Sequence, residues 1–295
     1  MTANEASVPL APAESGPLAV ICGGGSLPYA VAAAAAQSRR VVLFPLRGWA
    51  DPDRVTRFPH HWIALGQFGR FARLAKTEGC RDVVWIGGLV RPAISQIRLD
   101  VKTLVLLPRI VRAFRGGDNH LLSSVGRIFE DHGFRMLGAH QVVPSLLVPK
   151  GAVTRFKPDE RHCADIVRGL AILDAIGRFD IGQAVVVANQ HCLAVEGAEG
   201  TDGLLARIAE MRKSGRIRAT PGTGVLVKAP KPDQDRRFDL PVIGPQTVEG
   251  AARAGLAGIA VVAGSAMVAE ADRLVTLADR TSLFVVGVRN DGTFD

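Results

Sequence analysis

The segment Lys228–Gly244 combines the residue types that phosphate chemistry requires, because it is rich in lysine, arginine, aspartate and proline. Carboxylates can hold a hard divalent cation, and basic side chains can neutralise the charge that remains on phosphoryl oxygens. Prolines reduce the entropy that is lost when such groups are held in place. The alternative is a rigid loop whose solvated charges stabilise the fold little, but we interpret the segment as functional. Its candidate groups are Lys228, Lys231, Asp233, Asp235, Arg237 and Asp239.

A second acidic segment, Glu196–Asp202, lies between a predicted strand and a predicted helix. The ends of strands are the usual place for binding groups in α/β folds. Thr201 or Asp202 could serve only as a helix cap. Glu199 precedes a glycine and is harder to explain in that way, so we take Glu199 and Asp202 as candidate functional residues.

The glycine turn Gly23–Gly25 leads directly into a predicted helix. Backbone N–H groups at a helix start can hold a phosphate, which makes Gly24, Gly25 and Ser26 candidate substrate-binding residues. Ser26 is also expected to cap the helix. A purely structural turn is the alternative. The turn argues against classical NAD binding, because Pro28 occupies the third glycine position of the dinucleotide fingerprint and no acid follows the second strand.

Asp118 lies in a glycine-rich segment that precedes another predicted helix. Its carboxylate could bind a cation or a sugar hydroxyl. Asp118 or Asn119 could equally be the N-cap of that helix, a position that both residue types favour.

The composition favours a soluble α/β protein of two domains. The chain has 295 residues, 47% hydrophobic and 22% charged, with only one Tyr and three Trp, and its length exceeds that of a usual single domain. The net charge is +8, which suits phosphorylated small molecules or an anionic membrane surface. Nucleic acid is not expected, because no aromatic residues are interleaved with the densest basic cluster. That cluster contains Arg207, Arg212, Lys213, Arg216 and Arg218.

The cysteines indicate a reduced, cytoplasmic protein, since none of the four forms a CxxC pair. His162-Cys163 and His191-Cys192 suggest zinc, but adjacent residues point in different directions and no tetrahedral spacing supports such a site. We expect no signal peptide and no membrane-spanning segment.

The order of elements predicts a disordered tail over residues 1–16, a Rossmann-like domain over 17–150 and a second α/β domain over 151–295. Ligand is expected to bind in a cleft between the two domains. The first domain alternates strands and helices, as a parallel sheet requires. Its strands are expected at 18–22, 41–46, 62–65, 82–86 and 134–138, and its helices at 27–37, 68–78, 101–114 and 120–132.

The second domain is predicted to contain a hairpin, formed by residues 184–189 and 192–196. Further strands are expected at 258–262 and 283–288. Helices are expected at 160–176, 203–211, 247–254 and 268–278. The basic and apolar segment Arg98–Arg115 could touch a membrane or acyl chains, but a domain-packing helix interrupted by Pro108 is the preferred interpretation.

Taken together, six segments resemble the UDP-2,3-diacylglucosamine pyrophosphatase family of lipid A biosynthesis, the type found in Gram-negative bacteria that lack the calcineurin-like enzyme. Their order and spacing are more specific than any one of them, and they span about residues 17–288. One departure is Asn119, where the family shows a second acid. The segments are Ile21–Pro28, Leu65–Gly69, Ile86–Pro92, Gly117–Leu122, Ala194–Asp202 and Lys228–Gly244.

The resemblance implies an enzyme that hydrolyses UDP-2,3-diacylglucosamine to UMP and 2,3-diacylglucosamine 1-phosphate (lipid X) with Mg²⁺ or Mn²⁺. It implies that Asp235 is the functionally important aspartate. We expect Asp235, Glu199 and Asp202 to be catalytic, and Asp235, Asp233 and Asp239 to hold the metal. The expected substrate-binding residues are Gly24, Gly25, Ser26, Gln67, Asp118, Lys228, Lys231 and Arg237.

The enzyme is expected in the cytoplasm, associated peripherally with the inner membrane through its lipid substrate. Two other functions stay open: a nucleotide-sugar binding or regulatory protein without catalysis, and an oxidoreductase with a degenerate Rossmann turn. The sequence does not indicate the oligomeric state.

Overall fold

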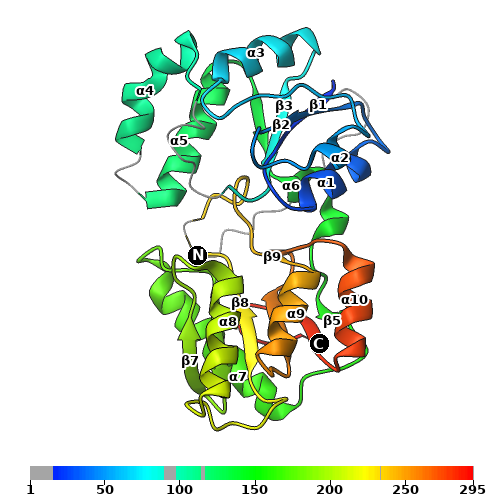
Figure 1. Cartoon of the computed structure of the whole chain (residues 1–295), viewed down its shortest axis with the longest axis vertical. Helices are drawn as coiled ribbons and strands as arrows, with labels where there is room; N and C mark the ends of the chain where they lie inside the picture. The colour runs from blue at the N-terminus through cyan, green and yellow to red at the C-terminus, as the bar shows by residue number, and fades with distance from the viewer. Residues whose placement is uncertain (1–15, 90–97, 114–116, 233, 295) are drawn as a thin grey trace, which may run out of the picture. The chain divides into compact units, whose positions relative to one another are not determined.

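The computed structural model describes residues 16–89, 98–113, 117–232 and 234–294, which form two compact units (Figure 1). Among these residues, the first unit comprises 16–111 and Ser124–Pro144, and the second comprises the rest. Each unit is a sheet with helices packed on it, so the predicted α/β class is confirmed. The predicted tail at 1–16 lies outside the described residues apart from Gly16.

The first unit is built on a parallel sheet with the strand order β2-β1-β3-β4. Every residue of its central strand β1 is buried, as expected for a strand covered on both faces. The strands are β1 (Leu18–Cys22), β2 (Val41–Pro45), β3 (Asp82–Ile86) and β4 (Arg135–Leu137). The helices are α1 (Leu27–Ala35), α2 (Pro52–Val55), α3 (Phe68–Thr77), α4 (Val101–Ala113), α5 (Gly117–Asp131) and α6 (Ala139–Val142), followed by a 3₁₀ turn at Pro144–Leu146.

An aromatic cluster joins α3 and α5 to the sheet of the first unit. The ring of Phe71 lies 4.8 Å from that of Phe44 on β2 and 5.2 Å from that of Phe129 on α5. Tilted and edge-on ring pairs of this kind stabilise beyond the area they bury. All three tryptophans of the chain, Trp49, Trp62 and Trp85, also belong to this unit.

Two predicted elements differ from the structure. Residues 62–65 do not form a strand: the segment follows the edge of β2 and makes only isolated bridges, at Leu43–His60 and Leu46–Ile63. The helix predicted at 268–278 begins at Ala271, because Val268 instead belongs to a short strand that pairs with another. In both places apolar residues are buried by a pairing that periodicity does not show.

The second unit has a mixed six-stranded sheet with the order β5-β12-β10-β8-β6-β7. β8, β10 and β12 are parallel, while β6 runs antiparallel to both β8 and β7, which confirms the predicted hairpin. The strands are β5 (Gly151–Ala152), β6 (Ala184–Ala188), β7 (His191–Val195), β8 (Val225–Lys228), β10 (Gly258–Val262) and β12 (Phe284–Val288). β9 (Val242–Ile243) and β11 (Met267–Val268) form a separate parallel pair.

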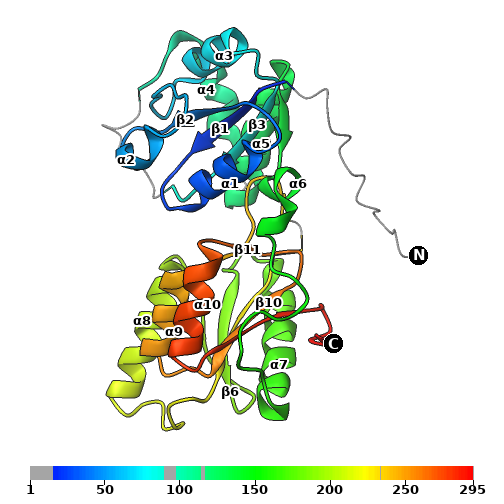
Figure 2. The same cartoon turned by 90° about the vertical axis from the view of Figure 1, so that its right-hand side faces the viewer.

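Helices cover both faces of this sheet (Figure 2). α7 (Glu160–Gly177) buries Ile166, Leu170 and Leu173 against one face. α8 (Gly200–Lys213), α9 (Pro245–Arg253) and α10 (Ala271–Arg280) cover the other face, where Leu204, Val248 and Leu274 are fully buried. Because both faces are covered, the polar contacts near the sheet lie at the ends of strands, as for Lys228 at the end of β8. Within the part of the chain that the structure describes, no helix is both long enough and apolar enough to cross a bilayer.

A buried ionic cluster holds the first residue of β3 in the first unit. Asp82 is almost fully buried and accepts hydrogen bonds from Arg135 (2.7 and 2.9 Å) and from Arg39 (2.9 Å). Burial alone would raise the pKa of Asp82, but the hydrogen bonds from the two arginines outweigh it, so the pKa lies below its usual range.

Replacing Asp82 with Ala should lower the free energy of unfolding of the first unit by about 3 kcal/mol, because it leaves the buried guanidinium of Arg39 unpaired. Since the carboxyl pKa is lowered by folding, this stabilisation is present above the unfolded pKa and disappears as the pH falls through the folded value. The difference from wild type should therefore shrink in acid. Urea titrations followed by tryptophan fluorescence measure it; the exposed Asp53→Ala is the control, and coincident midpoints would contradict the prediction.

Candidate functional site

The charged loop, defined here as residues 229–241, connects β8 to β9 and contains a tight ion pair. Asp235 accepts hydrogen bonds from Arg237 through Nε (3.0 Å) and Nη2 (2.8 Å), and the backbone N–H of Arg237 donates to Oδ1 (3.1 Å). Burial acts to raise the pKa of Asp235, but the hydrogen bonds from Arg237 lower it by more, so the pKa lies below its usual value. Asp235 is thus an ionised, half-buried carboxylate held beside a guanidinium.

Asp239, at the other end of the charged loop, has a different environment. Its Oδ2 accepts hydrogen bonds from the side-chain amides of Gln183 (2.7 Å) and Gln234. Burial raises the pKa of Asp239 above its ordinary value. Two carboxylates of one loop are therefore shifted in opposite directions, a pattern associated with functional sites.

The last residue of β8, Lys228, is buried at the base of the loop. Its ammonium donates to Thr201 Oγ1 (2.9 Å) and to the carbonyl of Val242 (3.1 Å). Burial lowers the pKa of Lys228, while the charges of Glu196, Asp202 and Asp239 act to raise it. In this structure the ammonium is enclosed by protein, which does not support its predicted role as a direct phosphate ligand.

A chain of hydrogen bonds connects Lys228 to the charged loop. The hydroxyl of Thr201 donates to Glu196 Oε1 (2.8 Å), and the N–H of Gln183 donates to Glu196 Oε2 (2.6 Å). The amide of Gln183 then holds Asp239. These residues come from the end of β8, the start of α8, the end of β7, the start of β6 and the charged loop. Because β6 runs antiparallel to β7 and β8, the start of β6 lies beside the ends of the other two strands. We call this set, Lys228, Thr201, Glu196, Gln183 and Asp239, the Lys228 network.

The other predicted groups of the second unit lie around this edge. Glu199 is exposed and pairs with Arg207 (2.8 Å), and Asp202 is exposed in the first turn of α8. Lys231 pairs with Asp180. Each predicted cation of the loop is thus already engaged by a protein group.

A metal site does not form among the described carboxylates. No group of three or more His, Cys, Asp or Glu side chains that could hold an ion exists within the described ranges. Asp235 faces Arg237, and Asp239 faces two amides, so neither presents an open pair of oxygens to a cation. Asp233, the third predicted ligand, lies outside the described residues. The described side chains thus form no ready set of ligands for Mg²⁺ or Mn²⁺, and the metal stays a prediction.

The glycine turn of the first unit is occupied by backbone pairing. The N–H of Gly23 donates to Ile86 (2.9 Å) and that of Gly24 to Gly88 (2.8 Å). A Cβ on Gly23 would come within 2.7 Å of the Gly87 carbonyl, so the two loops can approach only where side chains are absent. This structural reason removes the phosphate-binding argument for the N–H of Gly24, and leaves Gly25 and Ser26 as predictions. Ser26 precedes α1 but makes no side-chain cap, contrary to expectation.

Gln67 and Asp118 are the two remaining residues that the sequence predicts to bind substrate. The side-chain oxygen of Gln67 accepts the N–H of Ala64 (3.0 Å), a local structural contact. Asp118 is in the first turn of α5, and its side chain is not among those described. A substrate role for either stays a prediction.

The basic cluster of α8 and the following loop serves the fold in part. Arg212 is turned toward the loop and donates to the carbonyls of Ala219 (2.5 Å) and Thr223 (2.8 Å). Arg207 bonds Glu199 and the carbonyl of Val195. These two cations are therefore engaged within the unit.

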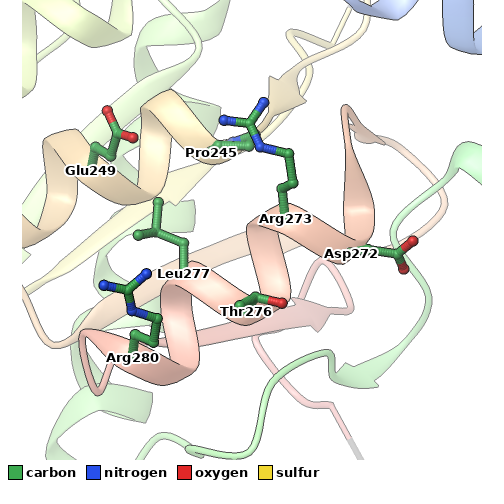
Figure 3. A pocket seen from close by; sticks show the side chains of 7 residues that line it. All are labelled: Pro245, Glu249, Asp272, Arg273, Thr276, Leu277 and Arg280. Carbon is green, nitrogen blue, oxygen red and sulfur yellow. The ribbon is translucent and has the colours of Figure 1, made fainter.

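A groove lies between α9 and α10, and Figure 3 shows the side chains that line it. Arg273 and Arg280 face it together with Glu249 and Asp272, so its charge is mixed. None of the residues predicted from the sequence lines this groove, and its helical walls carry no part of the Lys228 network.

The sequence did not single out Gln183, Glu196, Thr201 or Gln234 as site residues. Glu196 and Thr201 lie in the acidic segment Glu196–Asp202, so the composition of that segment points to the region but not to these two residues. Gln183 and Gln234 carry no pattern of their own, and only the strand register brings Gln183 next to Asp239.

Comparison with known proteins gives matches over nearly the whole chain. The LpxI N-terminal domain matches residues 17–146, and the LpxI C-terminal domain matches residues 149–286. The "UDP-2,3-diacylglucosamine pyrophosphatase LpxI" of Caulobacter vibrioides is 42% identical over 272 residues, which are 92% of this chain and 97% of that relative.

These matches correct the assignment made from the motifs, which described the family as the non-calcineurin-like type. Short glycine and acidic motifs indicate a resemblance, but the description 'non-calcineurin-like' says only which enzyme the family is not. The matches define it by its own two domains and support the LpxI assignment instead. The chain belongs to the LpxI family.

Proposed function

We propose that this protein hydrolyses the pyrophosphate bond of UDP-2,3-diacylglucosamine, giving UMP and 2,3-diacylglucosamine 1-phosphate in lipid A biosynthesis. The observation that carries the proposal is the 42% identity, over nearly the full length of both chains, to a relative named as a pyrophosphatase for this substrate. The charged loop adds chemical support, because the pKa values of Asp235 and Asp239 are shifted in opposite directions. Hydrolysis requires a water molecule to be oriented and deprotonated.

Asp235 is the residue that we propose to act on this water. Its lowered pKa keeps it ionised at neutral pH, so it can accept a proton. One O–H bond of the water breaks as its oxygen bonds to phosphorus, and the bond from phosphorus to the bridging oxygen breaks as the second phosphate leaves. We propose that Arg237, which is paired with Asp235 (2.8 Å), also contacts a phosphoryl oxygen and stabilises the charge that develops there.

The requirement for Mg²⁺ or Mn²⁺ is a separate proposal. A pyrophosphate carries more negative charge than the described basic groups can neutralise, since Lys228 is enclosed and Lys231 and Arg237 are paired. No described residue is assigned as a ligand, and the catalytic role of Asp235 does not depend on one. Glu199 and Asp202 remain proposed contributors at the edge of the same sheet.

The proposed substrate carries two acyl chains, which supports a reaction at a membrane surface. We therefore propose that the protein works in the cytoplasm, in peripheral contact with the inner membrane. Hydrocarbon chains leave a bilayer only at a large free-energy cost, so an enzyme that meets its substrate there gains access to it.

Release of UMP from UDP-2,3-diacylglucosamine, dispersed in detergent, tests the proposed reaction. We expect UMP and the acylated sugar phosphate in equal amounts with Mg²⁺ or Mn²⁺ present, and loss of both products with excess chelator. Release that persists in chelator would contradict the metal proposal while supporting hydrolysis. Tight binding of the substrate without any release would instead favour a binding protein.

A further inference from the structure

Helix α4 carries an apolar surface that the first unit does not cover. Val101 and Val105 are 79% and 76% exposed, and Leu104 and Val111 are each 50% exposed. With the preceding Leu99, this segment holds five of the eight exposed large hydrophobic residues found among the described residues. We call Val101, Leu104, Val105 and Val111 the α4 stripe.

The spacing of these residues places them on one side of the helix. Positions 101, 104, 105 and 111 fall within one arc at 3.6 residues per turn. The opposite side is anchored: Thr103 is buried, bonds Asp100 through its N–H (2.9 Å) and hydroxyl (2.8 Å), and accepts the N–H of Phe68 (3.1 Å). These contacts fix the rotation of α4, so the stripe faces outward because the fold holds it there.

Basic residues adjoin the stripe, with Lys102 and Arg109 along one side of it and Arg112 within its arc. Lys102, Arg109 and Arg112 are exposed on α4, and the helix contains no acidic residue. Arg109 pairs with Asp131 of α5 (2.7 Å), where both side chains are about half exposed. The opposite side of α4, with Leu106 and Ile110, is partly buried. An exposed apolar arc with adjoining cations and no acidic residue suits the interface of an anionic bilayer.

We infer that α4 docks on an anionic lipid bilayer, with its stripe at the boundary between headgroups and acyl chains and its cations on the lipid phosphates. This deepens the proposed function, since it rests on the substrate being reached at a membrane. A second copy of the chain is a poorer occupant. In a symmetric dimer the same patch meets itself, so Lys102 and Arg112 would face like charges.

Flotation of the full-length protein with vesicles, without substrate, tests the inference. Wild type should bind pure phosphatidylglycerol vesicles and not pure phosphatidylcholine vesicles, and added salt should weaken the binding. Val105→Asp should reduce binding at least about tenfold, since it removes the valine side chain that the bilayer would bury. Lys102→Ala should reduce it by about fivefold. Val167→Asp is the matched control, because Val167 is 50% exposed on α7, and it should bind like wild type.

Three results would overturn the inference. These are failure of wild type to float with phosphatidylglycerol, equal binding of Val105→Asp and wild type, or a dimer of wild type that Val105→Asp makes monomeric. UMP release from detergent-dispersed substrate separates this question from the reaction. A Val105→Asp protein that keeps its turnover in detergent but no longer floats supports the docking role, whereas inactivity of wild type would contradict only the proposed function.

Discussion

Replacement of Asp235 by asparagine should lower the turnover of UDP-2,3-diacylglucosamine by about 10²–10⁴-fold, the usual contribution of a positioned proton acceptor. Asparagine preserves the size of the side chain and can still accept hydrogen bonds from the backbone and from Arg237. It cannot accept a proton from water at neutral pH. The steady-state parameters of the purified variant, measured as UMP release, give this loss directly.

The distribution of the loss between kcat and KM distinguishes catalysis from positioning. If Asp235 accepts the proton, kcat falls and KM changes little. If it serves only to hold Arg237, KM should rise, because the guanidinium would no longer be fixed for phosphate. Asp272→Asn on α10 is a control for a charge removed from an exposed position. An Asp235→Asn variant with wild-type turnover would remove Asp235 from the mechanism.

Replacement of Lys228 by methionine should destabilise the second unit by about 3–5 kcal/mol, because it leaves the buried Glu196 and the partly buried Asp239 without their nearby cation. Methionine fills a similar volume, so the lost charge and not a cavity is responsible. Thr201 and the carbonyl of Val242 would also lose their donor. The midpoint of thermal unfolding should fall by roughly 10 °C, and turnover should fall with it as the charged loop loses its support.

The tryptophans allow this effect to be assigned to one unit. Because all three lie in the first unit, their fluorescence should report a transition that Lys228→Met leaves in place, while far-ultraviolet circular dichroism shows the loss in the second. Lys213→Met, at the exposed end of α8, should change neither signal. Unchanged circular dichroism in Lys228→Met would show that the Lys228 network does not stabilise the unit.

The sequence predicts the fold well where burial follows a simple period. Strands such as Leu18–Cys22 and Gly258–Val262, and the hairpin that begins at Ala184, are continuous apolar runs separated by turn residues, and the structure has them at these positions. Residues 62–65 are equally apolar but lie along an edge without completing a strand. Composition marks burial in both cases, whereas hydrogen-bond pairing distinguishes them.

The candidate site is less predictable because its chemistry depends on partners. Glu199 and Asp202 are the predicted functional residues of the segment Glu196–Asp202, and the sequence does not distinguish Glu196, which also precedes a glycine. The structure instead shows Glu196 buried with both oxygens bonded, and Glu199 exposed beside Arg207. Lys228 looks like any loop lysine in the sequence, and only its place at the end of a central strand encloses it. Residue types predict which chemistry is available, but the register of β6, β7 and β8 decides which groups meet.

The division of the chain into units has a consequence for how this protein can evolve. Residues Arg112–Ser123 belong to the second unit although the sequence on both sides of them belongs to the first, so the chain passes from one unit to the other after Val111, after Ser123 and after Pro144. A single recombination event near residue 147 would divide the two matched domains but separate the second unit from a segment it contains. Exchange of one half for that of an unrelated protein should therefore be disfavoured, and the two halves should be inherited together.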